Sequence, residues 1–180
     1  YYTALSTLGA SSGKWYFEAV VGSSSVTPPY TLVGITTNAN LASSSYIGGT
    51  ADSWAYRLRD GDKRTNGTDT VYGASAAVGD VIGCALDMDA GTVEFFKNNV
   101  SQGVAFTGLS GTMFLGVSTY ATTGSATNVA NFGQDSSFAG VKTRQGNTDA
   151  NGKGDFYYAP PKGYLALCTD NLAEPTIVDS

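Results

Sequence analysis

The chain has 180 residues, about the size of one domain, with 14% charged residues, a formal net charge of −5 and no histidine. The acidic balance argues against nucleic acid as a partner, because phosphate binding needs clustered Lys and Arg, and the missing histidine removes Ser-His-Asp and Cys-His catalytic sets. Because no apolar run reaches the roughly 20 residues of a membrane span, we also expect no membrane insertion.

Short strands separated by turns follow one another along the first two thirds of the chain. Apolar residues recur at alternate positions, and the 3.6-residue period of an amphipathic helix is missing between them. The predicted strands cover residues 15–21, 31–36, 53–58, 81–88, 92–97, 103–106, 113–120 and 128–132. Regular spacing of short strands predicts an all-β fold, an antiparallel β-sandwich.

The hairpin of residues 81–97 is apolar on both faces of its strands. Leu86 shares one face of the first strand with other apolar residues, whereas Phe95 and Phe96 point to opposite faces of the second strand. A strand that is apolar on both faces is typical of a sheet covered on both sides. We therefore expect this hairpin inside a sheet that is bent or packed on both sides, and not at an exposed edge.

Acidic residues gather at the turn of this hairpin. Asp87 and Asp89 suggest a carboxylate pair acting on a glycoside, and the run from Asp87 to Glu94 suggests a calcium loop. An EF-hand needs Gly at its sixth position and Glu at its twelfth, whereas here they come fifth and eighth. We favour a turn in which Asp is a common residue, with no catalytic group and no metal. Asp149–Asp155 is a second oxygen-rich loop, where calcium binding stays open.

The other motifs also predict neither an enzyme nor a cofactor. Glycine-containing stretches lack the strand and helix context of a nucleotide site, and no Gly-Lys-Ser or Gly-Lys-Thr occurs. Asp60 and Asp62 interrupt the basic residues between positions 57 and 64, so we interpret this stretch as a solvated loop face and not as an anion site. Only two cysteines occur, so we expect no disulfide framework.

Several motifs resemble the SPRY domain family. They are Ser12-Gly-Lys-Trp-Tyr-Phe17, Val33-Gly-Ile35, the hairpin within residues 78–99 and Phe114-Leu-Gly-Val-Ser118, in that order. The resemblance covers residues 12–133 and implies a concanavalin-like jelly roll that recognises partners through its loops. It divides the chain into a SPRY-like sandwich over residues 1–133 and a Gly- and Asn-rich loop with an aromatic segment over residues 134–180.

The resemblance also implies a candidate binding site in the loops. The stretch Tyr46–Tyr56 is similar to the Tyr-x-x-Leu-Gly-Ser…Trp-Gly-Trp stretch of SPRY proteins, in which the tyrosine and the small residues after it line a peptide pocket. We expect the loops at 28–30 and 120–123 to reach the same end of the sandwich. Tyrosine rings with a hydroxyl tip suit peptides and sugars equally. The candidate ligand-binding residues are Tyr30, Tyr46, Gly48, Gly49, Thr50, Tyr120 and Thr122. An open alternative is that these tyrosines only pack the loops.

The end of the chain returns to apolar and aromatic residues after a polar stretch. Those that we expect to dock, on the sandwich or on a neighbouring subunit, are Phe156, Tyr158, Tyr164, Leu165 and Leu167. Phe156–Pro175 looks like the segment that follows SPRY-like domains in structural proteins of tailed bacteriophages. The start at Tyr1 without an initiating Met suggests a processed product or a segment of a longer protein.

These features together predict a non-enzymatic binding module of a bacteriophage virion, in a tail fibre or similar surface protein. Such a module would adhere to a host-surface glycan or protein through its loops, as a homo-oligomer among other virion proteins. Its place would be the extracellular virion, after synthesis in the host cytoplasm. The alternative is a structural decoration or connector domain that holds virion proteins together. A cellular peptide-binding adaptor is a third interpretation, which would need a further domain.

Overall fold

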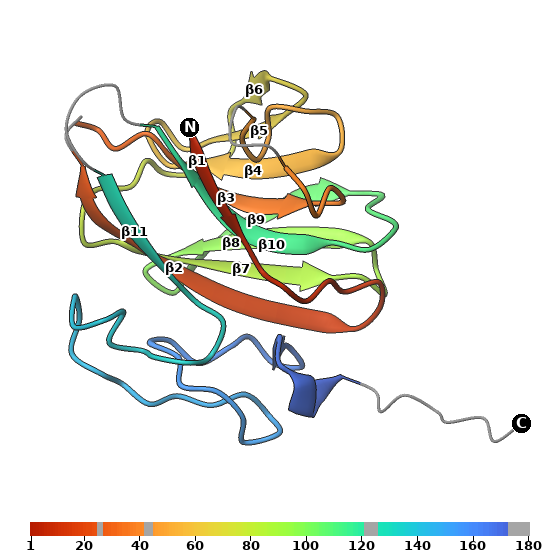
Figure 1. The fold of residues 1–180 in the computed structure, drawn as a ribbon, viewed down its shortest axis with the longest axis vertical. Coiled ribbons are helices and arrows are strands. Elements are labelled where there is room, and N and C mark those ends of the chain that lie inside the picture. The colour runs from red at the N-terminus through yellow and green to blue at the C-terminus, as the bar shows by residue number, and fades with distance from the viewer. Residues whose placement is uncertain (25–26, 42–44, 121–125, 173–180) are drawn as a thin grey trace, which may run out of the picture.

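The computed structural model describes residues 1–24, 27–41, 45–120 and 126–172. These residues form two antiparallel sheets packed face to face, which confirms the predicted all-β sandwich (Figure 1). The first sheet has the order β1 (Tyr2–Leu5), β10 (Phe114–Thr119), β3 (Thr31–Thr36), β4 (Ser53–Arg57), β5 (Asp62–Thr65) and β6 (Thr68–Thr70). The second sheet has the order β11 (Ala126–Asn131), β2 (Lys14–Ser24), β7 (Val81–Asp87), β8 (Thr92–Lys97) and β9 (Val100–Thr107), and β12 (Leu165–Ala166) pairs with β2.

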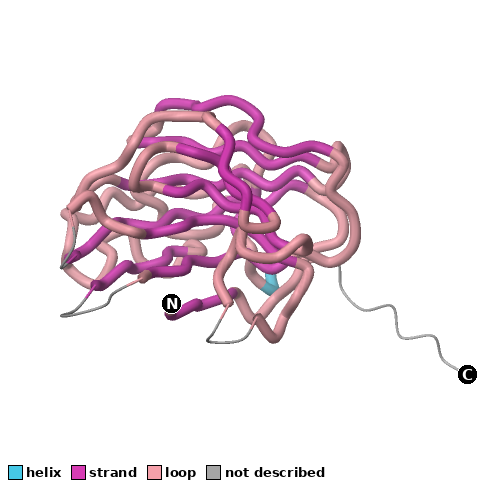
Figure 2. The backbone as a smooth tube through the Cα atoms, turned by 90° about the horizontal axis from the view of Figure 1, so that it is seen from above, coloured by secondary structure: helices cyan, strands magenta, loops and turns pink. Residues whose placement is uncertain are grey.

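All eight strands expected from the sequence are present, each with ends within three residues of the expected ones. The structure adds β1, β5, β6 and β12. The β5–β6 hairpin consists of polar residues that are exposed or half-buried, so it has no apolar alternation by which a strand can be recognised. Figure 2 shows strands throughout the sandwich. Among the described residues, the helical structure is the short turn η1 (Thr169–Asn171). In the part of the chain that the structure describes, no helix has the length and apolar character needed to span a membrane.

The core lies between the two sheets and is built from alternate side chains of both. Phe17, Leu86 and Phe95 of the second sheet and Ile35 and Leu115 of the first are wholly buried in it. Successive strand residues point to opposite faces, so each strand that borders this layer supplies alternate side chains to it. The core is therefore the direct result of the alternation in the sequence.

The expected position of the 81–97 hairpin is confirmed. The central strand β7 lies between β2 and β8, and all seven of its residues are buried. One face of β7 contributes Leu86 to the core, and on the other face Ala85 packs with Tyr16 and Phe156. The sheet is covered on both sides because the C-terminal segment lies on its outer face.

This C-terminal segment, residues 134–172, lies along the second sheet and is mostly loop (Figure 1). Its attachment centres on Glu18 of β2, which is wholly buried. One carboxylate oxygen of Glu18 accepts a hydrogen bond from the backbone N–H of Tyr157 and the other from that of Tyr158, both at 2.8 Å. Phe156 is wholly buried, with its ring 5.4 Å from that of Tyr16.

The other residues expected to dock divide into two groups. Leu167 is buried with 5% exposure, whereas Tyr158, Tyr164 and Leu165 are half-buried. Leu165 begins β12, which pairs in parallel with the start of β2. The segment thus packs on its own sandwich within the described residues. The division of the chain at residue 133 stays a prediction.

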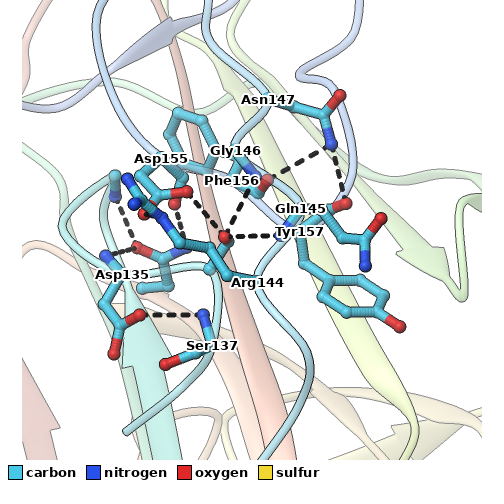
Figure 3. Close-up of polar contacts among 12 residues, drawn as sticks. Asp135, Ser137, Arg144, Gln145, Gly146, Asn147, Asp155, Phe156 and Tyr157 are labelled. Carbon is cyan, nitrogen blue, oxygen red and sulfur yellow. Dashed lines mark hydrogen bonds and ion pairs between the residues drawn. The ribbon is translucent and has the colours of Figure 1, made fainter. Parts of the chain in front are cut away.

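A network of polar contacts holds the loop of the C-terminal segment in shape (Figure 3). The Asp155 carboxylate accepts hydrogen bonds from Ser136 Oγ and Arg144 Nε, each at 2.6 Å. Asn147 pairs with Phe156 through both backbone groups, and its amide nitrogen donates to the Tyr157 carbonyl at 2.8 Å. The loop is therefore ordered by specific bonds, although it has almost no regular secondary structure.

Candidate functional site

Four tyrosines from separate segments of the chain meet at one end of the first sheet. Tyr1 precedes β1, Tyr30 precedes β3, Tyr46 lies between β3 and β4, and Tyr120 follows β10. The antiparallel register places the start of β1, the end of β10 and the start of β3 side by side. The Tyr120 N–H donates to the Tyr30 carbonyl at 3.0 Å, which ties two of these segments together. We call these four residues the tyrosine cluster.

The ring of Tyr1 lies in the middle of the tyrosine cluster. Its centroid is 4.0 Å from that of Tyr46, 4.8 Å from that of Tyr120 and 6.0 Å from that of Tyr30. The Tyr30 and Tyr120 rings are 5.6 Å apart in an edge-to-face arrangement. All four tyrosines are half-buried. Tyr1, Tyr30 and Tyr46 pack on a wholly buried floor of Leu32, Ile47 and Ala55. Tyr120 joins them through its contacts with the Tyr1 and Tyr30 rings. The cluster is thus rigidly supported from below and still presents ring surface to solvent.

Tyr1 has no part in the site that the sequence predicts. Its neighbours in the sequence offer no motif, and its place depends on the pairing of β1 with β10, which joins residues far apart in the chain. Burial and the contact with Tyr30 raise the pKa of Tyr1 above its ordinary value. Its hydroxyl is therefore protonated at neutral pH and can both donate and accept a hydrogen bond.

The small residues after Tyr46 shape the turn that carries this ring. Gly49 donates its N–H to the Tyr46 carbonyl at 2.9 Å. Gly48 has φ +86°, and a Cβ at this position would lie 2.9 Å from Ala55 Cβ and from the Arg64 carbonyl oxygen. A Cβ at Gly49 would lie 3.0 Å from the Tyr46 ring. Both positions need glycine for the turn to pack against β4 and beneath the ring.

Thr50 completes this turn through its contacts with Ser53. The two hydroxyl groups are 2.9 Å apart, and the Thr50 carbonyl accepts hydrogen bonds from the N–H groups of Ser53 and Asn66. The polar groups of this turn are thus engaged inside the protein, so the turn serves to position Tyr46. Direct ligand contacts by Gly48, Gly49 and Thr50 stay a prediction, and Thr122 lies outside the described residues.

An ion network fixes the Tyr46 hydroxyl. Arg64 donates to this hydroxyl at 2.9 Å and to both oxygens of Asp69 at 2.6 Å. Arg57 donates to the same Asp69 carboxylate at 2.6 Å and holds Asp60 with two further bonds. Two of the four basic residues expected to form a solvated loop face, Arg57 and Arg64, are therefore paired with carboxylates. This pairing leaves little positive charge available for an anion.

Arg59 differs from the other arginines of this region. It is exposed, and its guanidinium carbon lies 5.6 Å from the centroid of the Tyr30 ring. Among the described residues, no acidic side chain forms an ion pair with it. Arg59 thus provides hydrogen-bond donors beside the tyrosine cluster. In the sequence it was one of several basic residues between positions 57 and 64, and nothing there distinguished it from the others.

The two aspartates of the β7–β8 turn have structural contacts. One oxygen of Asp87 accepts the N–H groups of Asp89 and Ala90, and the other pairs with Lys14 Nζ at 2.8 Å. Asp89 accepts the N–H of Gly13 at 2.7 Å. Burial alone would raise the pKa of Asp87, but these bonds hold the pKa below its ordinary value. This arrangement favours the turn interpretation over a glycosidase pair, because both carboxylates accept hydrogen bonds from the backbone in and beside the turn.

Asp149, the first residue of the second oxygen-rich loop, caps that loop. One of its oxygens accepts the N–H groups of Asn151 and Lys153, and the other accepts the N–H of Ala166 and the amide of Asn171. Both oxygens therefore face N–H donors, which is typical of a capped loop. Over the described residues, no group of three or more His, Cys, Asp or Glu side chains is placed to hold a metal ion.

Comparisons with known proteins agree with this architecture. The E3 ubiquitin-protein ligase RKP of Arabidopsis thaliana is 33% identical over 97 residues, which are 54% of this chain and only 7% of that protein. The solved structure of the SPRY domain of human HERC1 is 26% identical, with a TM-score of 0.63, and the match covers 71% of this chain and 80% of that one. The SPRY domain family itself matches residues 14–135. The chain therefore belongs to the SPRY domain family, whose members mediate protein–protein interactions.

Proposed function

We propose that this SPRY domain binds a segment of a partner protein at the tyrosine cluster. The observation that carries the proposal is the convergence of four half-buried tyrosine rings from four separate segments, three of which pack on one apolar floor. Loops on a rigid sandwich commonly carry recognition. Tyrosine is enriched among residues that dominate binding energy, because it offers a large contact area and loses little conformational entropy.

The chemistry of the surface indicates what kind of segment would bind. The rings offer apolar faces, and Arg59 offers donors to a backbone carbonyl or a carboxylate of the partner. The Tyr46 hydroxyl is held by Arg64 at 2.9 Å, so its ring needs little ordering when a partner arrives. A surface that is already ordered binds with a smaller entropy cost.

The virion setting predicted from the sequence rests on residues 156–175, of which 173–175 lie outside the described residues. The two relatives reported above come from a plant and from human. They support protein binding, and they add nothing in favour of a bacteriophage. Attachment to a host-surface glycan or protein therefore stays a prediction, and the first test is directed at a peptide ligand.

The connector alternative assigns the exposed loops and residues 156–172 to contacts with neighbouring virion proteins. In the structure this segment covers the second sheet of its own chain, where Phe156 is wholly buried. A partner could reach Phe156 only if the segment left the sheet. The tyrosine cluster needs no such rearrangement, so we favour it as the binding surface.

A displayed library of random peptides, selected on the immobilised domain, tests this proposal. Tyr120→Ser removes one ring of the cluster, and Tyr164→Ser removes a half-buried tyrosine elsewhere as a matched control. We expect selected peptides to bind wild type and Tyr164→Ser equally, and Tyr120→Ser about tenfold more weakly or worse. Equal binding to all three proteins, or no selected peptide, would contradict the proposal. Glycan-array binding that is lost in Tyr120→Ser would instead indicate a carbohydrate ligand.

A further inference from the structure

A pocket of about 340 Å³ opens between the two sheets along one side of the sandwich. Its walls come from β1 and β10 of the first sheet and from β11 of the second. The strands β1 and β11 are the last strands of their sheets on this side (Figure 1). Within the described residues, neither of them pairs with a further strand on its outer side.

This pocket is separate from the tyrosine cluster, although the two share adjacent residues. Tyr2 and Thr119 line the pocket, whereas Tyr1 and Tyr120 belong to the cluster. Because successive side chains of a strand point to opposite faces, the ladder of β1 and β10 stands between the two sites. A ligand of the pocket would therefore contact residues that the proposed function does not use.

Two polar atoms at the pocket are shielded from solvent and have no hydrogen-bond partner among the described residues. They are Oγ1 of Thr119 and Nδ2 of Asn128, and both residues line the pocket. The other end of the Asn128 amide is held, because Oδ1 accepts a hydrogen bond from Thr31 Oγ1 at 3.3 Å. Folded proteins rarely leave shielded polar atoms unpaired, because this destabilises them. Such atoms in a pocket mark positions where a ligand can supply the missing bonds.

The lining of the pocket restricts the chemistry of that ligand. Among the described residues, no charged side chain lines the pocket, so none of them compensates a buried charge on the ligand. Nδ2 of Asn128 needs an acceptor, and the Thr119 hydroxyl can donate or accept. Ala4 and Val117 provide apolar wall. A primary carboxamide meets these requirements, since one small neutral group carries both a carbonyl acceptor and N–H donors.

We propose that the pocket takes the carboxamide side chain of an Asn or Gln from an extended segment of a partner protein. Small rotations of the Asn128 and Thr119 side chains bring their shielded polar atoms to the surface of the pocket. The carboxamide carbonyl then accepts from Asn128 and its N–H donates to the Thr119 hydroxyl, while its methylene groups contact the apolar wall. Tyr2, which is 71% exposed beside the pocket, covers the backbone of the bound segment. The adjacent edges of β1 and β11 offer backbone groups to an extended chain.

Titration of the isotope-labelled domain with capped amino acids, followed by NMR, tests this assignment. The probes are the N-acetyl, C-methylamide forms of asparagine and glutamine, with those of aspartate and leucine as charged and apolar controls of similar shape. We expect one of the two carboxamide probes to shift the side-chain NH₂ signals of Asn128 saturably, and the controls to bind about tenfold more weakly or worse. No saturable shift at Asn128, or equal responses to aspartate or leucine, would overturn the proposal.

Two substitutions at Thr119 separate binding from a structural role. Thr119→Val replaces the unpaired hydroxyl by a methyl group of the same shape, so we expect an unchanged or higher unfolding midpoint and at least tenfold weaker probe binding. Thr119→Ser keeps the hydroxyl and should retain binding. A lower midpoint in Thr119→Val with unchanged probe binding would show that the hydroxyl only supports the fold. Tyr120→Ser should leave probe binding unchanged. A loss of probe binding in this variant would contradict the separation of the pocket from the tyrosine cluster.

Discussion

The ring of Tyr1 stacks on the ring of Tyr46, with centroids 4.0 Å apart and planes inclined by 25°. Tyr1 precedes the edge strand β1, and Tyr46 belongs to the loop between β3 and β4. The contact therefore joins that loop to the edge of the sheet. It stabilises the cluster that we propose as the binding surface.

Replacement of Tyr1 by Ala tests this relationship. The change removes three ring contacts, and each such aromatic pair contributes about 0.5–1.5 kcal/mol beyond the buried area. We expect the free energy of unfolding, measured by chemical denaturation, to fall by about 1.5–4.5 kcal/mol. Tyr2→Ala is the matched control, because Tyr2 is 71% exposed and surface substitutions usually change stability by less than about 0.5 kcal/mol. Equal effects of the two changes would show that the stacked ring does not stabilise the domain.

The second prediction concerns the core. Leu86 is wholly buried between the sheets, so Leu86→Ala removes apolar contacts and leaves a cavity, at a cost of about 2–5 kcal/mol. Val104→Ala in β9 is the control, because Val104 is 52% exposed. We expect the unfolding midpoint in denaturant to fall strongly for Leu86→Ala alone. A small change in both variants would place Leu86 outside the cooperative core.

The third prediction concerns pH and Glu18. Burial raises the pKa of Glu18 from 4.5 to about 7, against the hydrogen bonds from Tyr158, Tyr157, Tyr16 and Asn131, which lower it. Between these two values the folded protein holds a proton that the unfolded chain has lost, so stability decreases as pH rises. The contribution of Glu18 is fully present below pH 4.5 and is lost as pH rises through about 7, at about 1.4 kcal/mol for each pKa unit.

Chemical denaturation over this pH range measures the effect. We expect Glu18→Gln to be less stable than wild type at low pH, because a single amide oxygen must accept both backbone N–H groups, and to show a flatter pH dependence. Carboxylates with lowered pKa values, such as Asp149 and Asp87, lose their contributions only at lower pH. If the free energy of unfolding of Glu18→Gln fell with pH as steeply as that of wild type, the pH dependence could not be assigned to Glu18.

The fourth prediction concerns the ion network beside Tyr46. Asp69 pairs with both Arg57 and Arg64, so Asp69→Asn leaves two guanidinium groups with less compensating charge. We expect acidic peptides selected on the domain to bind about tenfold more tightly, and this gain to decrease with added salt. The stability change should stay within about 1 kcal/mol, because partly exposed ion pairs contribute little.

Asp170→Asn is the control for this change, since Asp170 pairs with Lys153 in the C-terminal segment, away from the cluster. Titration calorimetry at two salt concentrations gives the affinities. An equal gain in both variants would mean that net charge alone sets the affinity, and that Arg57 and Arg64 have no local role.

The candidate site was only partly predictable from the sequence. Tyr30, Tyr46 and Tyr120 stand beside recognisable strand motifs, so their loops were identifiable, and the structure places them together. Tyr1 has no such motif, because its position depends on a strand pairing with β10. The glycines after Tyr46 were identified by resemblance, but their close packing against β4 became visible only in three dimensions.

The amino-acid sequence alone predicts the class of fold, because apolar alternation and glycine at turns act between near neighbours in the chain. It also determined that the 81–97 hairpin is covered on both faces. The three-dimensional arrangement is needed to see which loops share a surface, which polar groups are already bonded and what covers the second sheet. Those outcomes depend on the register of strands far apart in the sequence, such as β1 with β10, and on single long-range bonds such as those of Glu18. Local pattern carries no information about such pairings, since each strand could meet several others until the whole core packs.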